Sequence, residues 1–416
     1  MAGSADFFCS LYKRMRTANT CGRVFLIIAF GIFAFSAGCQ QTEPGLSKAS
    51  AVDVRPDRTV PKPEDRNIVT VSLVGDIMVH SDQLAAAYNK SSGKYSFQGF
   101  FTEVKPFLSS ADLTIGNLET TLAGRSKGYT GYPKFNSPQE ILQALQWSGF
   151  DVLTTANNHA MDRKKDGVLK TIDYLEAAGI KHTGTFSSAA GRNEPLIIDI
   201  KGLKIGILAY TYGTNGLQIP RGSEYLVNLL NPERVREDIR KAREKGADII
   251  LVSPHFGVEY RRSPNEAGQR MVEELFANGA DIVVGSHPHV LQLMTRRDRQ
   301  KDMEGFFAAY SLGNFISAQM DQYRDSGVIF NLKIEKDPAS GKARLIEANY
   351  IPTWVHVYRE NGKIAFRVLA VEKAIRDYEQ GLDKKLTEKD YIRLKQVWQE
   401  TTSLISGPSA PDICHV

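Results

Sequence analysis

Three segments of the chain repeat one pattern, in which a helix-like stretch is followed by a glycine, a short apolar run and a histidine. The segments are residues 137–159, 231–255 and 266–289, and their glycines are Gly149, Gly246 and Gly279. Strands that alternate with helices and are apolar along their whole length are typical of a mainly parallel sheet covered on both faces. The pattern therefore predicts an α/β fold.

The first of these segments carries recognisable helix signals. Ser137 is a suitable N-cap, Pro138 suits the first turn, and Glu140 completes a capping box. Gly149 is expected to end the helix, and residues 150–156 are expected to form the strand that follows.

Two further apolar strands, residues 68–76 and 111–119, also end in polar side chains. Right-handed crossovers bring the C-terminal ends of parallel strands to one edge, where open α/β sheets bind ligands. We therefore expect the polar residues at these strand ends to converge, namely Asp76, Asn117, Glu119, Asn158, His159, His255, His287 and His289.

The remaining segments have antiparallel character. Residues 195–213 predict a hairpin that turns at Gly202, and residues 327–370 hold further strands separated by turn signals. Residues 387–402 predict an amphipathic helix with Thr387 and Asp390 at its start. We expect this helix to pack against the domain rather than to bind a partner, through one side that carries Tyr391, Leu394 and Trp398.

The strand-end residues have the chemistry of a metal site. Carboxylate, amide oxygen and imidazole together suit Zn, Mn or Fe. Ligands from several strands suggest more than one ion, and two ions about 4 Å apart would share Glu119 and activate a water molecule. His182, His356 and His415 lack such a setting. His80 lies near Asp76, which leaves its role ambiguous.

The N-terminal region predicts an export signal. Residues 24–37 are apolar and follow several basic residues, but they are shorter than the roughly 20 residues of a membrane-spanning helix. Residues 36–39, Ser-Ala-Gly-Cys, resemble a bacterial lipobox in which Cys39 is lipidated; an uncleaved anchor and plain secretion are the alternatives. We expect a signal over residues 1–39, a flexible tether over 40–66, a folded domain over 67–370 and a helical extension over 371–416.

Composition narrows the class of partner. The net charge of +5 on 416 residues includes a basic N-terminus, and no basic stripe with interleaved aromatic residues is present, so we expect no nucleic-acid partner. The four cysteines form neither a CxxC motif nor a disulfide framework. This usage suits an exported protein that does not rely on disulfides.

Five short motifs occur in a characteristic order: "GDIM", "GNLE", "ANNH", "SPHFG" and "GSHPH". In this order they resemble the metal-binding blocks of the calcineurin-type metallophosphoesterases. Together with "HFGVEY" and "YSLGNF", they resemble the CapA-like capsule-biosynthesis family more narrowly, over residues 70–320. That family is associated with bacterial poly-γ-glutamate synthesis. The resemblance implies an αββα sandwich of mixed sheets, with a ligand-binding edge at the C-terminal ends of the strands.

The resemblance also implies roles for the strand-end residues. One metal would take Glu119, Asn158, His255 and His287, and a second would take Asp76, Glu119 and His289. His159 would act as the general acid or steady developing negative charge.

Two residues depart from the phosphoesterase pattern. Met78 stands where those enzymes have histidine, and Glu119 stands where they have a bridging aspartate. We therefore expect one firm metal site and a weaker or absent second one, completed by His80 or by water.

Other residues are candidates for binding substrate, namely Asn117, Glu259, Tyr260 and Asn314. Asp162 is expected either to orient His159 or to cap a helix. The sequence thus predicts an exported, membrane-anchored protein of poly-γ-glutamate capsule biosynthesis, acting as a metal-dependent hydrolase or transferase on an acidic polymer. The alternatives are an extracytoplasmic phosphoesterase for a phosphate-containing substrate and a non-catalytic subunit of a membrane polymer synthase.

Overall fold

A computed structural model describes residues 67–297, 306–405 and 414–415. The predicted signal segment, including Cys39, and the predicted tether lie outside these residues. No helix within the described ranges combines the length and the apolar character needed to cross a membrane.

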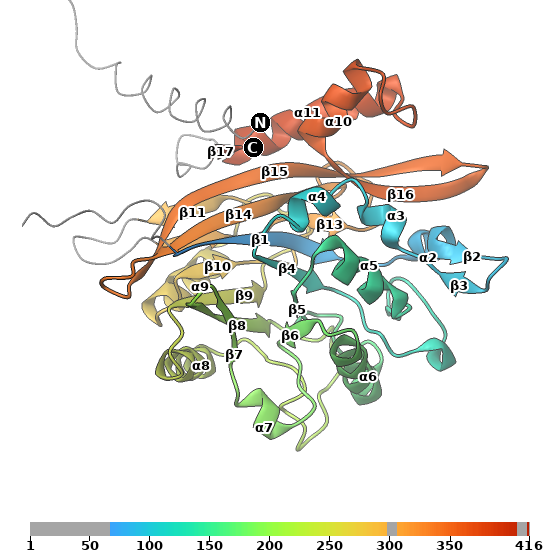
Figure 1. Cartoon of the computed structure of the whole chain (residues 1–416). Helices are drawn as coiled ribbons and strands as arrows, with labels where there is room; N and C mark the ends of the chain where they lie inside the picture. Colours follow the sequence, from blue (N-terminus) through green and yellow to red (C-terminus); the bar gives the residue numbers. More distant parts are fainter. Residues whose placement is uncertain (1–66, 298–305, 406–413, 416) are drawn as a thin grey trace, which may run out of the picture. The chain divides into compact units, whose positions relative to one another are not determined.

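The first of two large sheets is mixed and has nine strands, seven of which follow the order β16-β15-β14-β1-β4-β5-β6 (Figure 1). β13 pairs with β1, and β17 pairs with β15, beside this main path. The strands are β1 (Asn67–Ile77), β4 (Leu113–Leu118), β5 (Val152–Thr154), β6 (Lys181–Thr183), β13 (Asn314–Ile316), β14 (Ser326–Lys336), β15 (Ala343–Glu360), β16 (Lys363–Ala370) and β17 (Cys414–His415).

The second large sheet has six strands in the order β11-β12-β10-β9-β8-β7. Its central pairs are parallel, and the antiparallel β7–β8 hairpin forms one edge, turning at Gly202 as the sequence predicts. The strands are β7 (Leu196–Ile200), β8 (Leu203–Thr211), β9 (Ile249–His255), β10 (Ile282–Val284), β11 (Met294–Arg297) and β12 (Phe306–Ala309). A separate small hairpin joins β2 (Tyr88–Asn89) to β3 (Lys94–Tyr95).

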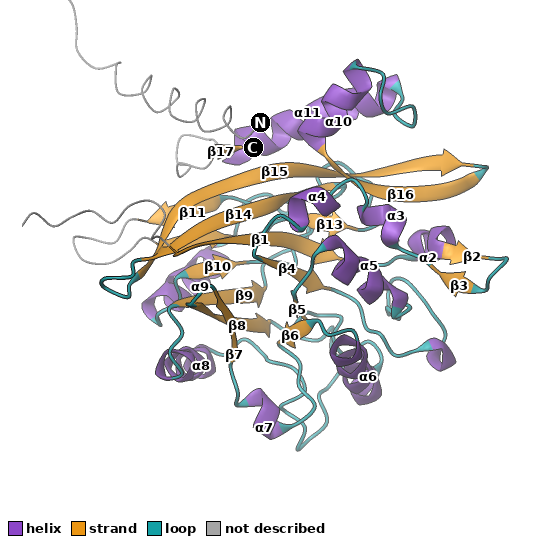
Figure 2. Ribbon diagram, in the orientation of Figure 1, coloured by secondary structure: helices purple, strands orange, loops and turns teal. Residues whose placement is uncertain are grey.

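The two large sheets pack face to face. One apolar core combines β1, β4 and β14 of the first sheet with β8, β9 and β10 of the second. A second core joins α2, α3, α4 and α5 to the other face of the first sheet, and a third joins α8 and α9 to the other face of the second sheet (Figure 2). The predicted αββα sandwich of mixed sheets is therefore confirmed.

The helices that form these layers vary in length, and several are single turns. They are α2 (Ser81–Ala87), α3 (Gln98–Phe101), α4 (Lys105–Leu108), α5 (Glu140–Ser148), α6 (Lys164–Ala177), α7 (Ala189–Arg192), α8 (Pro232–Glu244), α9 (Glu266–Ala277), α10 (Val371–Glu379) and α11 (Glu388–Ile405).

The helix starts show where local signals hold and where they fail. Asn231 and Asn265 cap α8 and α9 by accepting hydrogen bonds from backbone N–H groups in the first turn. The predicted cap at Ser137 is wrong, because α5 begins at Glu140 and has no side-chain cap. The Ser137 hydroxyl instead lies 2.7 Å from the Thr120 hydroxyl, so a tertiary contact replaces the local one.

The C-terminal helices α10 and α11 pack onto the β15–β16 end of the first sheet, as the sequence predicts for the later helix. Leu394 and Val397 of α11 join Trp354 and Leu369 in a separate apolar cluster. Thr387 directly precedes α11, and its backbone N–H and hydroxyl both donate to the Asp390 carboxylate in the first turn of the helix.

His356 provides a buried polar link between this sheet and α11. Its Nδ1 accepts a hydrogen bond from Arg367 Nε at 3.0 Å, and its Nε2 lies 3.5 Å from an Asp390 carboxylate oxygen. Burial, assisted by the neighbouring Arg367 charge, lowers the pKa of His356 from 6.5 to about 4. The folded protein therefore holds this histidine neutral where the unfolded chain takes up a proton.

We predict that His356 contributes an acid-sensitive part of the stability. Its pKa is lower in the folded state, so stability falls as the pH drops from about 6.5 towards 4, by roughly 2 kcal/mol between pH 7 and pH 5. Denaturant unfolding of the wild type and of His356→Gln at both pH values measures this difference. Equal losses of stability in the two proteins would contradict the assignment.

Candidate metal centre

The polar residues at the strand ends of the first sheet are aligned by the register of the strands. Asp76 of β1 lies opposite Asn117 of β4 on one side and opposite Asn314 of β13 on the other. Glu119 follows β4 directly, and its backbone N–H donates to Ile77 at 2.9 Å. The carboxylates and amides of three neighbouring strands therefore meet at one edge.

The histidines of the second sheet lie at the same edge as these carboxylates and amides. His255 is the last residue of β9, and a parallel β-bridge pairs it with Ser286 in the loop after β10. His289 in that loop has its Nδ1 3.0 Å from an Asp76 carboxylate oxygen, which joins the edges of the two sheets. The structure thus brings together side chains that are more than 200 residues apart in the sequence.

Close backbone approach explains the glycine before Asp76. A Cβ atom on Gly75 would lie 1.8 Å from the carbonyl oxygen of Gly313, so no larger residue fits there. The Asp76 N–H donates to that same carbonyl at 3.0 Å. The glycine therefore lets β1 and β13 meet beside the site.

The loop that carries His287 and His289 has an unusual backbone. The φ angles of these residues are 100° and 57°, and Pro288 separates them. Residues with a Cβ atom adopt such conformations at a cost of about 1–3 kcal/mol each. Both histidine side chains are nonetheless buried, so the surrounding packing holds them in strained positions at the sheet edge.

Two overlapping groups of buried side chains have the geometry of metal-ligand sets. One contains Glu119, His287 and His289, and the other contains Asp76, Glu119 and His255, with all candidate ligand atoms in each group within 4.8 Å of one another. Glu119 belongs to both groups. Its Oε1 lies 3.6 Å from His255 Nε2 and 3.7 Å from His289 Nε2.

This sharing agrees with the bridging place implied for Glu119, but the grouping of histidines differs from the implied ligand sets. His255 groups with Asp76, whereas His287 groups with His289. Asn158 remains next to His255, with its Oδ1 2.9 Å from His255 Nε2.

The electrostatics of the cluster favour a bound cation. Burial raises the pKa of Glu119 well above its usual value, and the neighbouring Asp76 raises it further. Burial and the other histidines lower the pKa of His255 well below 6.5, and mainly burial lowers that of His287 to about 4. Among the described residues, Glu119 Oε1 and His287 Nδ1 are buried and have no hydrogen-bond partner. A divalent ion would satisfy both atoms, so the donor set fits Mn, Zn or Fe.

Neighbouring polar groups orient these ligands. Ser286 Oγ lies 2.8 Å from His255 Nδ1, on the opposite side of the ring from Glu119. The Asn117 amide donates to Asp76 at 2.8 Å and to Glu119 at 3.3 Å. Asn314 Oδ1 lies 3.1 Å from His289 Nδ1. Such contacts fix the ring orientation of metal-binding histidines in general.

The hydrogen bonding of His80 does not favour the ligand role that is one of the two expectations for it. Its Nδ1 accepts a hydrogen bond from the Ala318 N–H at 3.2 Å, so the proton of the neutral ring lies on Nε2. Burial lowers the pKa of His80 to about 4, which keeps the ring neutral. Met78 is itself buried. Of the two groups proposed for completing the second site, water therefore fits better than His80.

His159 and Asp162 form a separate pair beside the cluster. His159 Nδ1 lies 2.7 Å from Asp162 Oδ2, and both side chains are buried. The same carboxylate oxygen accepts the Phe135 N–H at 2.7 Å. Because α6 has Arg163 rather than Asp162 at its N-cap, the structure favours the orienting role of Asp162 over the capping role.

The other predicted residues lie on the rim or behind the ligands. Glu259 and Tyr260 are exposed in the loop after β9, and the Tyr260 ring centroid lies 6.1 Å from that of His289. Asn314 is fully buried behind His289, with its Nδ2 donating to the Arg324 carbonyl at 2.8 Å.

Sequence reasoning missed Tyr212, which lies at the end of β8 with its ring 4.7 Å from that of His287. Its position directly after an apolar strand, in "AYTYG", is the signal that would have found it.

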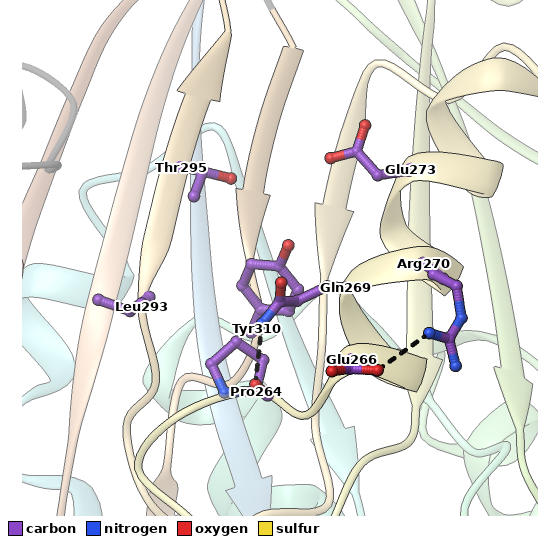
Figure 3. Close-up of a pocket in the computed structure, with 8 residues that line it drawn as sticks. All are labelled: Pro264, Glu266, Gln269, Arg270, Glu273, Leu293, Thr295 and Tyr310. Carbon is purple, nitrogen blue, oxygen red and sulfur yellow. Dashed lines mark hydrogen bonds and ion pairs between the residues drawn. The ribbon is translucent and has the colours of Figure 1, made fainter.

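A surface hollow of about 670 Å³ lies elsewhere, between α9 and β11 (Figure 3). Its wall includes Gln269 of α9, which donates to the Pro264 carbonyl, and Tyr310 beyond β12. None of the predicted site residues lines this hollow. The cluster and the hollow are therefore separate features.

The fold and the buried cluster define an α/β sandwich protein with a carboxylate–histidine centre suited to a divalent metal. Residues 70–319, more than half of the chain, match the family described as bacterial capsule synthesis protein PGA_cap. The chain belongs to this family, which confirms the resemblance to capsule-biosynthesis proteins.

Two relatives carry matching descriptions. The capsule biosynthesis protein CapA of Bacillus anthracis is 29% identical over 278 residues, which cover 64% of this chain and 64% of the relative. The PGA biosynthesis protein CapA of Bacillus subtilis is 28% identical over 274 residues, which cover 64% of this chain and 68% of the relative. The chain thus spans just under two thirds of the length of the first of them.

Solved structures with a similar arrangement have low identity. The NAD nucleotidase NadN of Haemophilus influenzae matches with a TM-score of 0.44 and 14% identity, covering 82% of this chain and 61% of that chain. The calcineurin-like phosphoesterase YfkN of Bacillus subtilis matches with a TM-score of 0.37 and 13% identity, covering 81% of this chain and 98% of that chain.

We predict that Glu119→Gln abolishes metal binding without unfolding the protein. The raised pKa favours the protonated form of Glu119 in the ion-free fold, so the isosteric amide keeps its packing and removes the negative charge that a cation requires. Metal analysis after reconstitution with Mn, Zn and Fe, together with thermal unfolding with and without chelator, measures both effects.

His182→Gln is the matched control, because His182 lies on β6 and belongs to neither ligand group. The control should bind metal as the wild type does and lose thermal stability on chelation. Full metal content in Glu119→Gln would exclude Glu119 as a shared ligand.

Proposed function

We propose that this chain is an exported, membrane-anchored protein of poly-γ-glutamate capsule biosynthesis that acts as a metal-dependent hydrolase or transferase. The buried cluster around Glu119, inside the segment that matches the capsule synthesis family, carries this proposal. The similarity to the two CapA proteins, one of capsule biosynthesis and one of PGA biosynthesis, supports the same process. The substrate class is an acidic polymer.

The residues of the cluster would hold a Mn, Zn or Fe ion, with Glu119 shared between a firm site and a weaker one. A bound ion of this kind polarises a carbonyl or phosphoryl oxygen and lowers the pKa of bound water. Asn117, Ser286 and Asn314 hold the ligand side chains in place through the hydrogen bonds described above.

We infer that His159 moves a proton in such a reaction. Its Nδ1 is occupied by Asp162, which leaves Nε2 for exchange with substrate. In hydrolysis of a γ-linked amide, water adds to the carbonyl carbon and loses a proton, the C–N bond breaks, and His159 delivers a proton to the leaving amine. The proton lost by the water restores His159, so that the products are a carboxylic acid and an amine. In a transfer reaction, an acceptor amine takes the place of water.

The lipobox-like N-terminal sequence supports the membrane-anchored arrangement. A lipid on Cys39 would hold the protein at the outer face of the cell membrane, and residues 40–66 would give the domain reach. This position suits a partner role beside a membrane-bound polymer synthase.

We predict that His159→Gln lowers turnover of γ-linked glutamate peptides by about 10²-fold or more, because it removes general acid–base catalysis. Asp162→Asn should lower turnover less, since the imidazole remains but loses its orienting carboxylate. Steady-state assays on the metal-loaded full-length chain measure both changes, with metal content as the check that the centre stays intact.

The same assays separate the alternatives. Turnover of aryl phosphate esters alone, lost in His159→Gln, would assign a phosphoesterase instead. Absence of turnover on every substrate, with a synthase complex that survives His159→Gln, would assign an accessory subunit.

We also predict that Cys39→Ser abolishes fatty-acid labelling of the protein in its bacterial host, because the lipidated thiol is lost. Metabolic labelling followed by membrane fractionation measures this. Cys21→Ser is the control, since Cys21 precedes the apolar segment and should leave labelling unchanged. Persistent labelling of Cys39→Ser would contradict lipidation at this position.

A further inference from the structure

We propose that Arg324 forms a carboxylate-binding subsite on the rim of the metal centre and selects acidic substrates there. The inference rests on the proposed function, whose acidic polymer carries carboxylates beside the bond that reacts. It adds a residue that lies outside every motif described above, in the turn between β13 and β14.

The position of Arg324 is set by Tyr260. The guanidinium carbon lies 4.5 Å from the centroid of the Tyr260 ring, in a cation–π arrangement. Tyr260 connects Arg324 to the candidate metal centre, because the centroid of the Tyr260 ring lies 6.1 Å from that of the His289 ring. Arg324 therefore places a fixed positive charge one aromatic ring away from a candidate metal ligand.

Polar contacts hold the backbone of Arg324 against the centre. Its carbonyl accepts the Asn314 amide at 2.8 Å, and the other end of that amide lies 3.1 Å from His289 Nδ1. A single buried side chain thus connects the arginine segment with the ligand. A displacement of the Arg324 backbone would therefore disturb the His289 ring.

The C-terminal extension supports the same segment from outside. Asp325 accepts two hydrogen bonds at 2.8 Å from Arg393 of α11, and a third at 2.8 Å from the indole N–H of Trp354. Arg262, after β9, donates to the Glu400 carbonyl of α11 and packs over the ring of Tyr323. The turn that carries Arg324 is consequently held between the centre and α11.

The guanidinium is available to a substrate. Its present acidic partner is Asp321, whose side chain is 70% exposed, while the arginine side chain is 26% exposed. An ion pair with so exposed a carboxylate contributes little to stability. A guanidinium has five N–H donors arranged for two-point binding of a carboxylate. A substrate carboxylate can therefore share or replace the contact with Asp321.

The experiment measures binding of two probes to the metal-loaded full-length chain in detergent. One probe is a γ-linked glutamate oligomer, and the other is the same oligomer with its carboxylates converted to amides. We expect the wild type to prefer the acidic probe by about ten-fold or more, as hydrogen bonds to charged groups allow. Arg324→Gln should remove this preference and leave metal content unchanged.

Further variants separate recognition from general charge and from folding. Arg270→Gln removes an equal charge from exposed α9, where Arg270 pairs with Glu266, and should keep the preference. Arg324→Lys should keep only part of it, because lysine lacks the planar fork. Tyr260→Leu, which removes the supporting ring, should also weaken it.

The outcomes distinguish failure of the Arg324 subsite from failure of the proposed substrate class. If the wild type prefers the acidic probe and Arg324→Gln does so equally, the subsite is wrong and the proposed function stands. If the metal-loaded wild type shows no preference for the acidic probe, the proposed substrate class fails and the subsite fails with it.

Discussion

The burial of Glu119 among three histidines and a second carboxylate is the constraint on which the site depends. Without an ion, burial favours the protonated form of this carboxyl and the neutral forms of His255 and His287, as the shifts in the pKa of these three groups indicate. A cation reverses the preference of the carboxyl, because it stabilises the charged carboxylate, and it binds the nitrogens of imidazoles that are already neutral. The cluster is therefore less stable as a structural core than as a binding site, which is the pattern expected of a functional centre.

The sandwich architecture makes this burial feasible. Each sheet supplies only part of the ligand set, and the two edges meet through the contact between His289 and Asp76. His287 and His289 have a strained, left-handed backbone, and both of their rings lie at the junction between the two sheets. Gly75 and the neighbouring Gly313 allow β1 and β13 to approach closely enough for Asp76 and Asn314 to face the same histidine.

The sequence predicted the parts of the molecule that depend on local pattern. Helix, glycine, strand and terminal histidine recur within short segments, so the sheet class and the convergence of strand ends could be inferred from residues such as His255 and Glu119. Arg324 could not, because its contacts join segments that approach only in the folded chain. Tyr212 has a local signal, since it directly follows an apolar strand, but its contact with His287 forms only in the folded chain. The wrong cap at Ser137 has the same origin, since Thr120 competes for its hydroxyl.

The rim also shows why the metal centre alone does not determine the substrate. The same fold class supports different reactions, and selectivity comes from residues grafted around the centre. Here those residues lie on loops after β8, β9 and β13, and α11 holds two of these loops through Arg393 and Arg262. The C-terminal extension thus contacts two loops at the rim of the candidate centre, although its last helix contributes none of the candidate metal ligands.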